Sequence, residues 1–165
     1  MSNKMVMTIV ATGGLLLSGV VVTAQEGAAT RQDIAVSSEL RALLRAEMRE
    51  IASGMQSMTL ALAGADWQVI KTTSDKIRAS YILEQKLTAA QRQELERKLP
   101  EQFKQLDAAF HQRAEKLAVA AAAHDAELTL FHYTRLMESC TACHTAYAKS
   151  RFPAFSPPEP DAHHH

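Results

Sequence analysis

The chain is poor in cysteine and has no excess of charge of either sign. Cys140 and Cys143 are the only two cysteines among 165 residues, so no second cysteine pair exists to complete a zinc site. The 18 basic and 18 acidic residues cancel formally, whereas a nucleic-acid binder shows a basic excess or stripe. No segment alternates apolar and polar residues over a useful length, and the sequence therefore predicts no β-strands.

The two cysteines belong to a single short motif, Cys140-Thr141-Ala142-Cys143-His144. The C-x-x-C-H form is typical of a covalent attachment site for haem c. On a helix, cysteines three residues apart share a face, so each thiol can form a thioether with one haem vinyl group. The histidine that follows can then present a ring nitrogen to the iron.

One alternative for the cysteine pair is a redox disulfide of the thioredoxin kind. Such a pair usually follows a strand in a βαβ pattern, and this chain has no such pattern. A second alternative is that the two cysteines supply two of the four ligands of a zinc site. The chain has no second cysteine pair to supply the other two. We therefore expect one covalent haem c.

Residues 1–24 resemble a secretory signal. The segment carries one charge, Lys4, then a long apolar run, and it ends in small residues at Ala24. The alternative is an uncleaved membrane anchor, since roughly 17–25 apolar residues suffice to span a bilayer. The small-residue ending and the polar residues from Gln25 onward favour cleavage after Ala24 and a periplasmic protein. Export also suits haem c, which is attached outside the cytoplasm.

The rest of the chain has the pattern of an all-α domain. Apolar residues recur every three or four positions, and this predicts four long helices over about 37–63, 66–86, 100–123 and 125–149, with a short helix near 88–99. Short connections between long helices indicate an antiparallel four-helix bundle. The predicted inward residues include Leu40, Leu44, Met48, Ile51, Met55, Met58 and Leu62 in the first helix and Leu128, Phe131, Leu136, Cys140, Cys143 and Tyr147 in the last.

The predicted domain organisation follows from these boundaries. Residues 25–36 are expected to be an N-terminal extension, and residues 37–152 the four-helix cytochrome domain. The end, 153–165, is rich in proline and polar residues, and we expect it to be disordered. Its terminal run His163-His164-His165 is more typical of a solvated end or an added tag than of a metal site.

A leader, four helices and one C-x-x-C-H motif in the last helix resemble the cytochrome c prime family. Tyr147 and Lys149, an aromatic and a basic residue after the motif, also resemble the family ending. The resemblance implies a bundle with haem between the helices, His144 as the proximal ligand, and a first-helix residue over the other face of the iron. The low-spin branch, the c-556 type, places a methionine there and transfers electrons.

The resemblance favours Met48 as this distal ligand, because it lies early in the first helix. Met55 is the alternative methionine, roughly 10 Å further along the helix axis, and an open site is the third alternative. One departure is that family members often carry an arginine one turn before the distal residue, where this chain has Leu44.

Two function classes follow, an electron carrier with redox partner proteins and a high-spin protein that binds NO or CO at an open iron site. We expect no enzymatic activity, because a peroxidase would need a distal histidine or arginine. His111, His124 and His132 are weak ligand candidates, because a helix histidine without a partner motif is more often a surface or capped residue. The family also forms homodimers through the first two helices, which makes a homodimer an expectation here.

Overall fold

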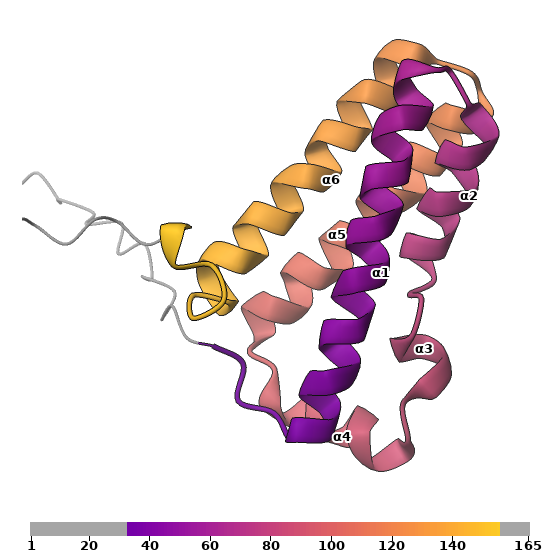
Figure 1. Ribbon diagram of the computed structural model, residues 1–165. Helices are drawn as coiled ribbons and strands as arrows, with labels where there is room; N and C mark the ends of the chain where they lie inside the picture. The colour runs from indigo at the N-terminus through magenta and orange to yellow at the C-terminus, as the bar shows by residue number, and fades with distance from the viewer. Residues whose placement is uncertain (1–32, 156–165) are drawn as a thin grey trace, which may run out of the picture.

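The protein is an antiparallel four-helix bundle (Figure 1). The computed structural model describes residues 33–155, except the side chains of residues 84 and 85. The predicted fold class is confirmed. The predicted signal, most of the N-terminal extension and the end of the tail lie outside the described residues. The helices are α1 Ser38–Ala63, α2 Trp67–Arg78, α3 Leu83–Lys86, α4 Ala89–Lys98, α5 Glu101–Ala122 and α6 Ala126–Tyr147, followed by a short 3-10 turn at Pro153–Phe155.

Side-chain caps begin three of the four long helices. Ser37, Asp66 and Asp125 each accept a hydrogen bond from a backbone N–H group in the first turn of α1, α2 and α6, and such caps satisfy amide groups that have no partner within the helix. Pro100 precedes α5, where its missing N–H group costs nothing. Thr88 and Gln91 form the predicted capping box of α4.

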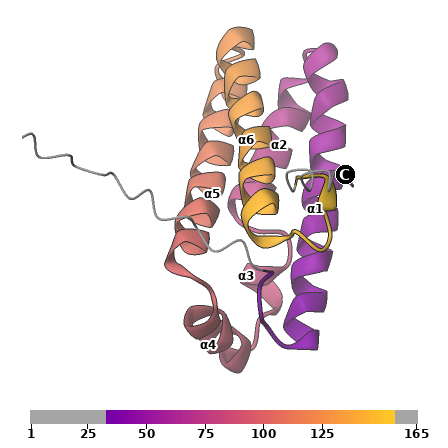
Figure 2. The same cartoon turned by 90° about the vertical axis from the view of Figure 1, so that its left-hand side faces the viewer.

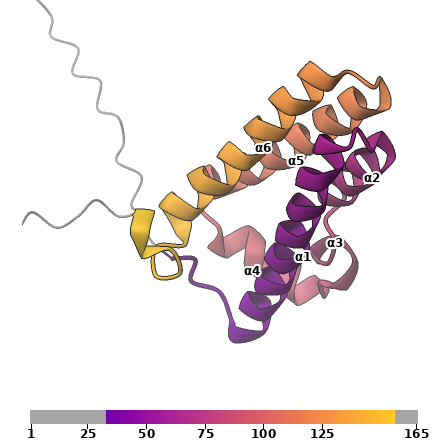
Figure 3. The same cartoon turned by 45° about the horizontal axis from the view of Figure 1, so that its top comes forward.

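The bundle is built from two helix pairs that diverge. α1 packs mainly against α2, whereas α5 packs against both α2 and α6. α1 and α6 run antiparallel, and they approach each other near the turn after α1 and separate toward the start of α1 (Figures 1 and 3). There, α3 and α4 connect α2 to α5 at the end of the bundle (Figure 2). The N-terminal half of α1 and the C-terminal half of α6 are therefore the least enclosed part of the fold.

The apolar core lies where the four long helices converge. It contains Ile51, Met55, Met58, Ala61, Ile70, Ile77, Ala114, Leu117, Ala121 and Leu136. Burial of this apolar surface is the main term that stabilises the bundle. None of the helices in the described part of the chain is long and apolar enough to cross a membrane.

Three features differ from the sequence-based expectations. The second helix ends at Arg78 rather than near Lys86, because Ser80 takes a left-handed backbone conformation with φ of 57°. Met48, Leu128 and Phe131 are exposed, at 45%, 43% and 50%, rather than inward, and the last two lie on the outer side of α6. The tail begins with the short turn at Pro153–Phe155 rather than with irregular chain.

Candidate haem attachment site

The three residues of the predicted attachment motif lie in the last two turns of α6. Cys140 and Cys143 are free thiols, and both are partly buried. Burial raises the pKa of the Cys140 thiol, and burial together with the charge of Asp107 raises that of Cys143 to about 11. Both thiols are therefore neutral at pH 7. Their spacing of three residues gives them a common face of the helix.

His144 is half-buried and is covered on one side by an aromatic ring. The imidazole stacks on Phe152, with 4.2 Å between ring centroids and 16° between ring planes. Burial lowers the pKa of His144, because a low-polarity environment disfavours the charged ring. A neutral imidazole is the form that can donate a nitrogen lone pair to a metal.

A stripe of α6 that includes this motif faces a stripe of α1. The two helices meet where Thr59 Oγ1 lies 2.7 Å from Tyr133 Oη, which also donates to the Met55 carbonyl oxygen at 3.4 Å. Residues spaced by about 3.6 positions share a helix face. On that basis the α6 stripe is Tyr133, Met137, Cys140 and His144, and the α1 stripe is Met48, Ala52, Met55 and Thr59.

Met48 and His144 are equally far in sequence from the Thr59–Tyr133 contact. Met48 precedes Thr59 by eleven residues, and His144 follows Tyr133 by eleven residues. Eleven residues correspond to about 16 Å of helix at 1.5 Å per residue. Because α1 and α6 are antiparallel, these equal steps carry the two side chains away from the Thr59–Tyr133 contact in the same direction, into the part where the helices diverge (Figure 3).

The three first-helix methionines have different environments. Met58 is fully buried, and its sulfur accepts a hydrogen bond of 3.5 Å from Ser74 Oγ. Met55 is 6% exposed and belongs to the apolar core. Met48 is 45% exposed, although it is a large apolar side chain on a face that points toward another helix. Met48 is therefore the methionine whose side chain is uncovered.

The residues around the motif fit a large apolar group. Met137 on α6, one turn before Cys140, is 42% exposed and lies on the same facing stripe. Met137 is thus an uncovered apolar side chain next to two neutral thiols and a neutral imidazole. No group of three or more His, Cys, Asp or Glu side chains that could hold a metal ion occurs among the described residues. Two thiols and one imidazole are the side chains that a haem c needs, and the haem itself supplies the iron.

The C-terminal end of α6 is fixed to α5 by aromatic and polar contacts. Tyr147 is buried, packs edge-on against Phe103 at 5.3 Å, and its hydroxyl lies 3.2 Å from Gln102 Oε1. Arg113 donates to the Arg135 carbonyl oxygen at 2.9 Å. The motif is therefore carried by a helix end that is held against α5.

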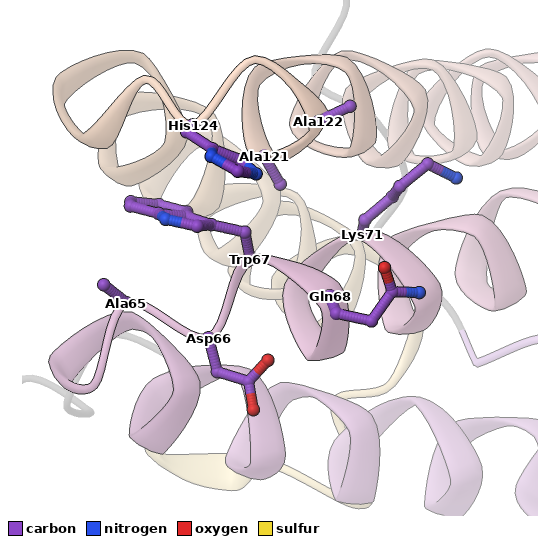
Figure 4. Close-up of a pocket in the computed structure, with 8 residues that line it drawn as sticks. All are labelled: Ala65, Asp66, Trp67, Gln68, Lys71, Ala121, Ala122 and His124. Atoms are coloured by element: carbon purple, nitrogen blue, oxygen red, sulfur yellow. The ribbon is translucent and has the colours of Figure 1, made fainter.

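Two of the other candidate histidines have partners outside the motif. His124 stacks on Trp67 with 5.7 Å between ring centroids, beside an open cavity of about 420 Å³ at the other end of the bundle (Figure 4). His111 Nδ1 lies 2.8 Å from the Ile77 carbonyl oxygen on α2. None of the motif residues lines that cavity.

The sequence pattern does not identify two residues that the structure singles out, Phe152 beside the motif and Glu47 on α1. Phe152 follows the predicted end of the helix, and its place before Pro153 was interpreted only as a helix stop. Glu47 interrupts the apolar stripe of α1 but is 2% exposed. The signal in the sequence that could have identified Glu47 is its position directly before Met48, the predicted distal ligand.

The fold and this site define a helical protein with a c-type haem attachment motif in its last helix. The model of one family, described as Cytochrome C', matches residues 29–148. The chain therefore belongs to the cytochrome C' family, and the family implies a c-type haem. No curated protein and no solved structure matched the chain.

Proposed function

We propose that this chain is an exported cytochrome that transfers single electrons through one haem c. Cys140 and Cys143 would hold the haem through thioethers, His144 would be the proximal ligand of the iron, and Met48 the distal ligand. The equal eleven-residue steps from the Thr59–Tyr133 contact support this proposal, because they give Met48 and His144 the same distance along their helices from the point where α1 meets α6.

Each residue would contribute a defined part of the chemistry. A bound haem supplies an iron that takes up and releases one electron. The two thioethers prevent loss of the group, and the neutral imidazole of His144 can donate its nitrogen without first losing a proton. The Met48 thioether would close the second axial position and raise the reduction potential. Small gases would then find no open coordination site.

The ligand assignment is tested by optical spectra of the ferric and ferrous protein and of a Met48→Ala variant. We expect the unmutated protein to be low-spin in both states and to bind carbon monoxide slowly. Met48→Ala should become high-spin, with a lower reduction potential and rapid binding of carbon monoxide to the ferrous form. Met137→Ala is the matched control, because Met137 is equally exposed on the facing helix, and its spectrum should stay low-spin.

One result would contradict the electron-carrier assignment, and another the assignment of Met48 as the ligand. A high-spin spectrum of the unmutated protein would favour the alternative, a protein that binds NO or CO at an open iron site. A Met48→Ala spectrum identical to that of the parent would exclude Met48 as a ligand and leave Met55 or an open site.

Covalent attachment and export are tested together by intact mass. After expression with a haem c maturation system, the purified protein should begin at Gln25 and carry the mass of one haem. A mass equal to the bare polypeptide, with haem that acid and acetone extract, would contradict the thioethers. A retained N-terminal segment would contradict cleavage after Ala24 but not haem attachment.

A further inference from the structure

Glu47, the residue before Met48, is a buried carboxylate that binds three backbone amides. It is 2% exposed. Its Oε1 accepts from the Tyr81 N–H at 2.8 Å, and its Oε2 accepts from the Ile82 N–H at 2.6 Å and the Leu83 N–H at 3.2 Å. None of the ion pairs among the described side chains involves Glu47. Three charge-assisted hydrogen bonds therefore compensate for its burial.

These amides are available because of how α2 ends. Ser80 has a left-handed backbone with φ of 57° and turns the chain away from α2. α3 begins at Leu83 without a hydrogen bond from the side chain of its N-cap residue, Ile82. The first amides of a helix have no partner within it, and Glu47 supplies that partner from another helix. The carboxylate thus joins α1 to the turn between α2 and α3.

The N-terminal half of α1 has little else to hold it. Glu47 is the one buried residue of α1 between Leu40 and Ile51. The start of the helix is attached through Ser37, whose N–H and Oγ donate to the two carboxylate oxygens of Glu94 at 2.6 and 2.8 Å. Between Leu40 and the apolar core, the Glu47 side chain joins α1 to the turn at residues 81–83.

Successive helix residues point about 100° apart, since a turn contains 3.6 residues. With Glu47 held toward the turn at residues 80–83, Met48 lies on the neighbouring face of α1, in the stripe that also contains Thr59, which contacts α6. We propose that Glu47 is a positioning residue for the distal ligand, because its three hydrogen bonds fix the rotation and place of α1 at the level of Met48. This inference rests on the proposed function, since it requires that Met48 binds the iron.

The test is Glu47→Gln in the haem-containing protein. The side-chain amide nitrogen of glutamine cannot accept a hydrogen bond, so at least one of the three bonds is lost. Met48 should then leave the iron more often. We expect a ferric spectrum with a high-spin component, and binding of carbon monoxide to the ferrous form that is faster by about tenfold, the factor that corresponds to 1.4 kcal/mol.

Glu50→Gln is the matched control, because it removes the same charge from an exposed position of α1 one turn away. Its spectrum and rate of carbon monoxide binding should equal those of the parent. Hydrogen exchange provides a readout that does not depend on the haem. The amides of residues 81–83 should exchange faster in Glu47→Gln and be unchanged in Glu50→Gln.

The outcomes separate this inference from the proposed function. If Met48→Ala alters the spin state and Glu47→Gln does not, the positioning role is wrong and the function stands. If Met48→Ala leaves the spectrum unchanged, the Met48 ligand assignment and the positioning role are both wrong. If Glu47→Gln fails to fold, Glu47→Asp decides, because it keeps the charge but shortens the side chain. It should show a smaller shift in the same direction, and a parental spectrum would overturn the inference.

Discussion

Phe152 covers one face of the His144 imidazole, with the two rings nearly parallel at 4.2 Å between centroids. The contact depends on the chain reversing direction after α6. The Phe152 N–H donates to the Ala148 carbonyl oxygen at 3.0 Å, and so does the Arg151 N–H at 3.1 Å. The turn after the helix therefore places an aromatic ring against the predicted proximal ligand and fixes the plane of its imidazole.

Replacing this ring should loosen the proximal ligand. In Phe152→Ala we expect a broader distribution of imidazole orientations, seen as broadened paramagnetic resonance lines of the ferric protein. We also expect a lower midpoint of thermal unfolding, because a stacked aromatic pair contributes about 0.5–1.5 kcal/mol beyond its buried area. Phe152→Tyr keeps the ring and should behave as the parent. Identical resonance spectra for Phe152→Ala and the parent would show that the stack does not orient the ligand.

Met58 and Met48 should respond in opposite ways to truncation. Met58 is fully buried in the core, so Met58→Ala should lower the free energy of unfolding by about 2–5 kcal/mol without changing the spin state. Met48→Ala removes a side chain that is 45% exposed and should change the spectrum with a smaller loss of packing. Chemical denaturation and optical spectra of both variants measure the two effects. A spectral change in Met58→Ala alone would contradict the ligand assignment.

The bounds of the helices could be predicted largely from local signals. Ser37, Asp66 and Asp125 have side chains that cap a helix, and Pro100 cannot continue one. All four begin or precede helices where expected. The attachment motif was equally local, since its five residues are contiguous. Local chemistry of this kind does not depend on how the helices pack.

Long-range contacts could not be predicted in this way. The early end of α2 coincides with amides that bind Glu47, which is 34 residues away from Tyr81. Phe131 has the helical spacing of a core residue, yet it lies outside and packs under the Arg135 guanidinium at 5.3 Å from its ring centre. The periodic pattern gives the faces of a helix, but the neighbouring helices determine which face is buried.

Gly54 permits the close approach of α1 to the residues after α2. A Cβ atom added at this position would lie 2.6 Å from the Tyr81 hydroxyl oxygen and 2.9 Å from Thr73 Cγ2. Gly54→Ala should therefore destabilise the fold by about 1–3 kcal/mol through overpacking, although alanine is ordinarily the better helix former. Adding Tyr81→Phe removes the nearer oxygen and should restore part of the loss. Unfolding of the single and double variants by denaturant measures the loss caused by Gly54→Ala and the part that Tyr81→Phe restores.

His111 should make the stability of the protein depend on pH. The Asp107 carboxylate, whose Oδ1 lies 3.7 Å from His111 Nε2, raises the pKa of the imidazole despite its partial burial. The backbone carbonyl of Ile77 and the charge of Glu47 act in the same direction. The folded state thus binds the proton more tightly than the unfolded chain, whose histidine has its ordinary value of about 6.5.

The sign of the pH effect follows from this difference. The stabilisation from His111 is fully present below about pH 6.5 and is lost as the pH rises through the higher pKa of the folded state. Asp107→Asn should remove most of this dependence, because it removes the largest cause of the shift. His111→Gln should remove all of it. Thermal unfolding midpoints from pH 5.5 to pH 8.5 test the effect, with each variant compared with the parent at every pH. A parent and His111→Gln with parallel profiles would show that His111 binds its proton equally well in both states.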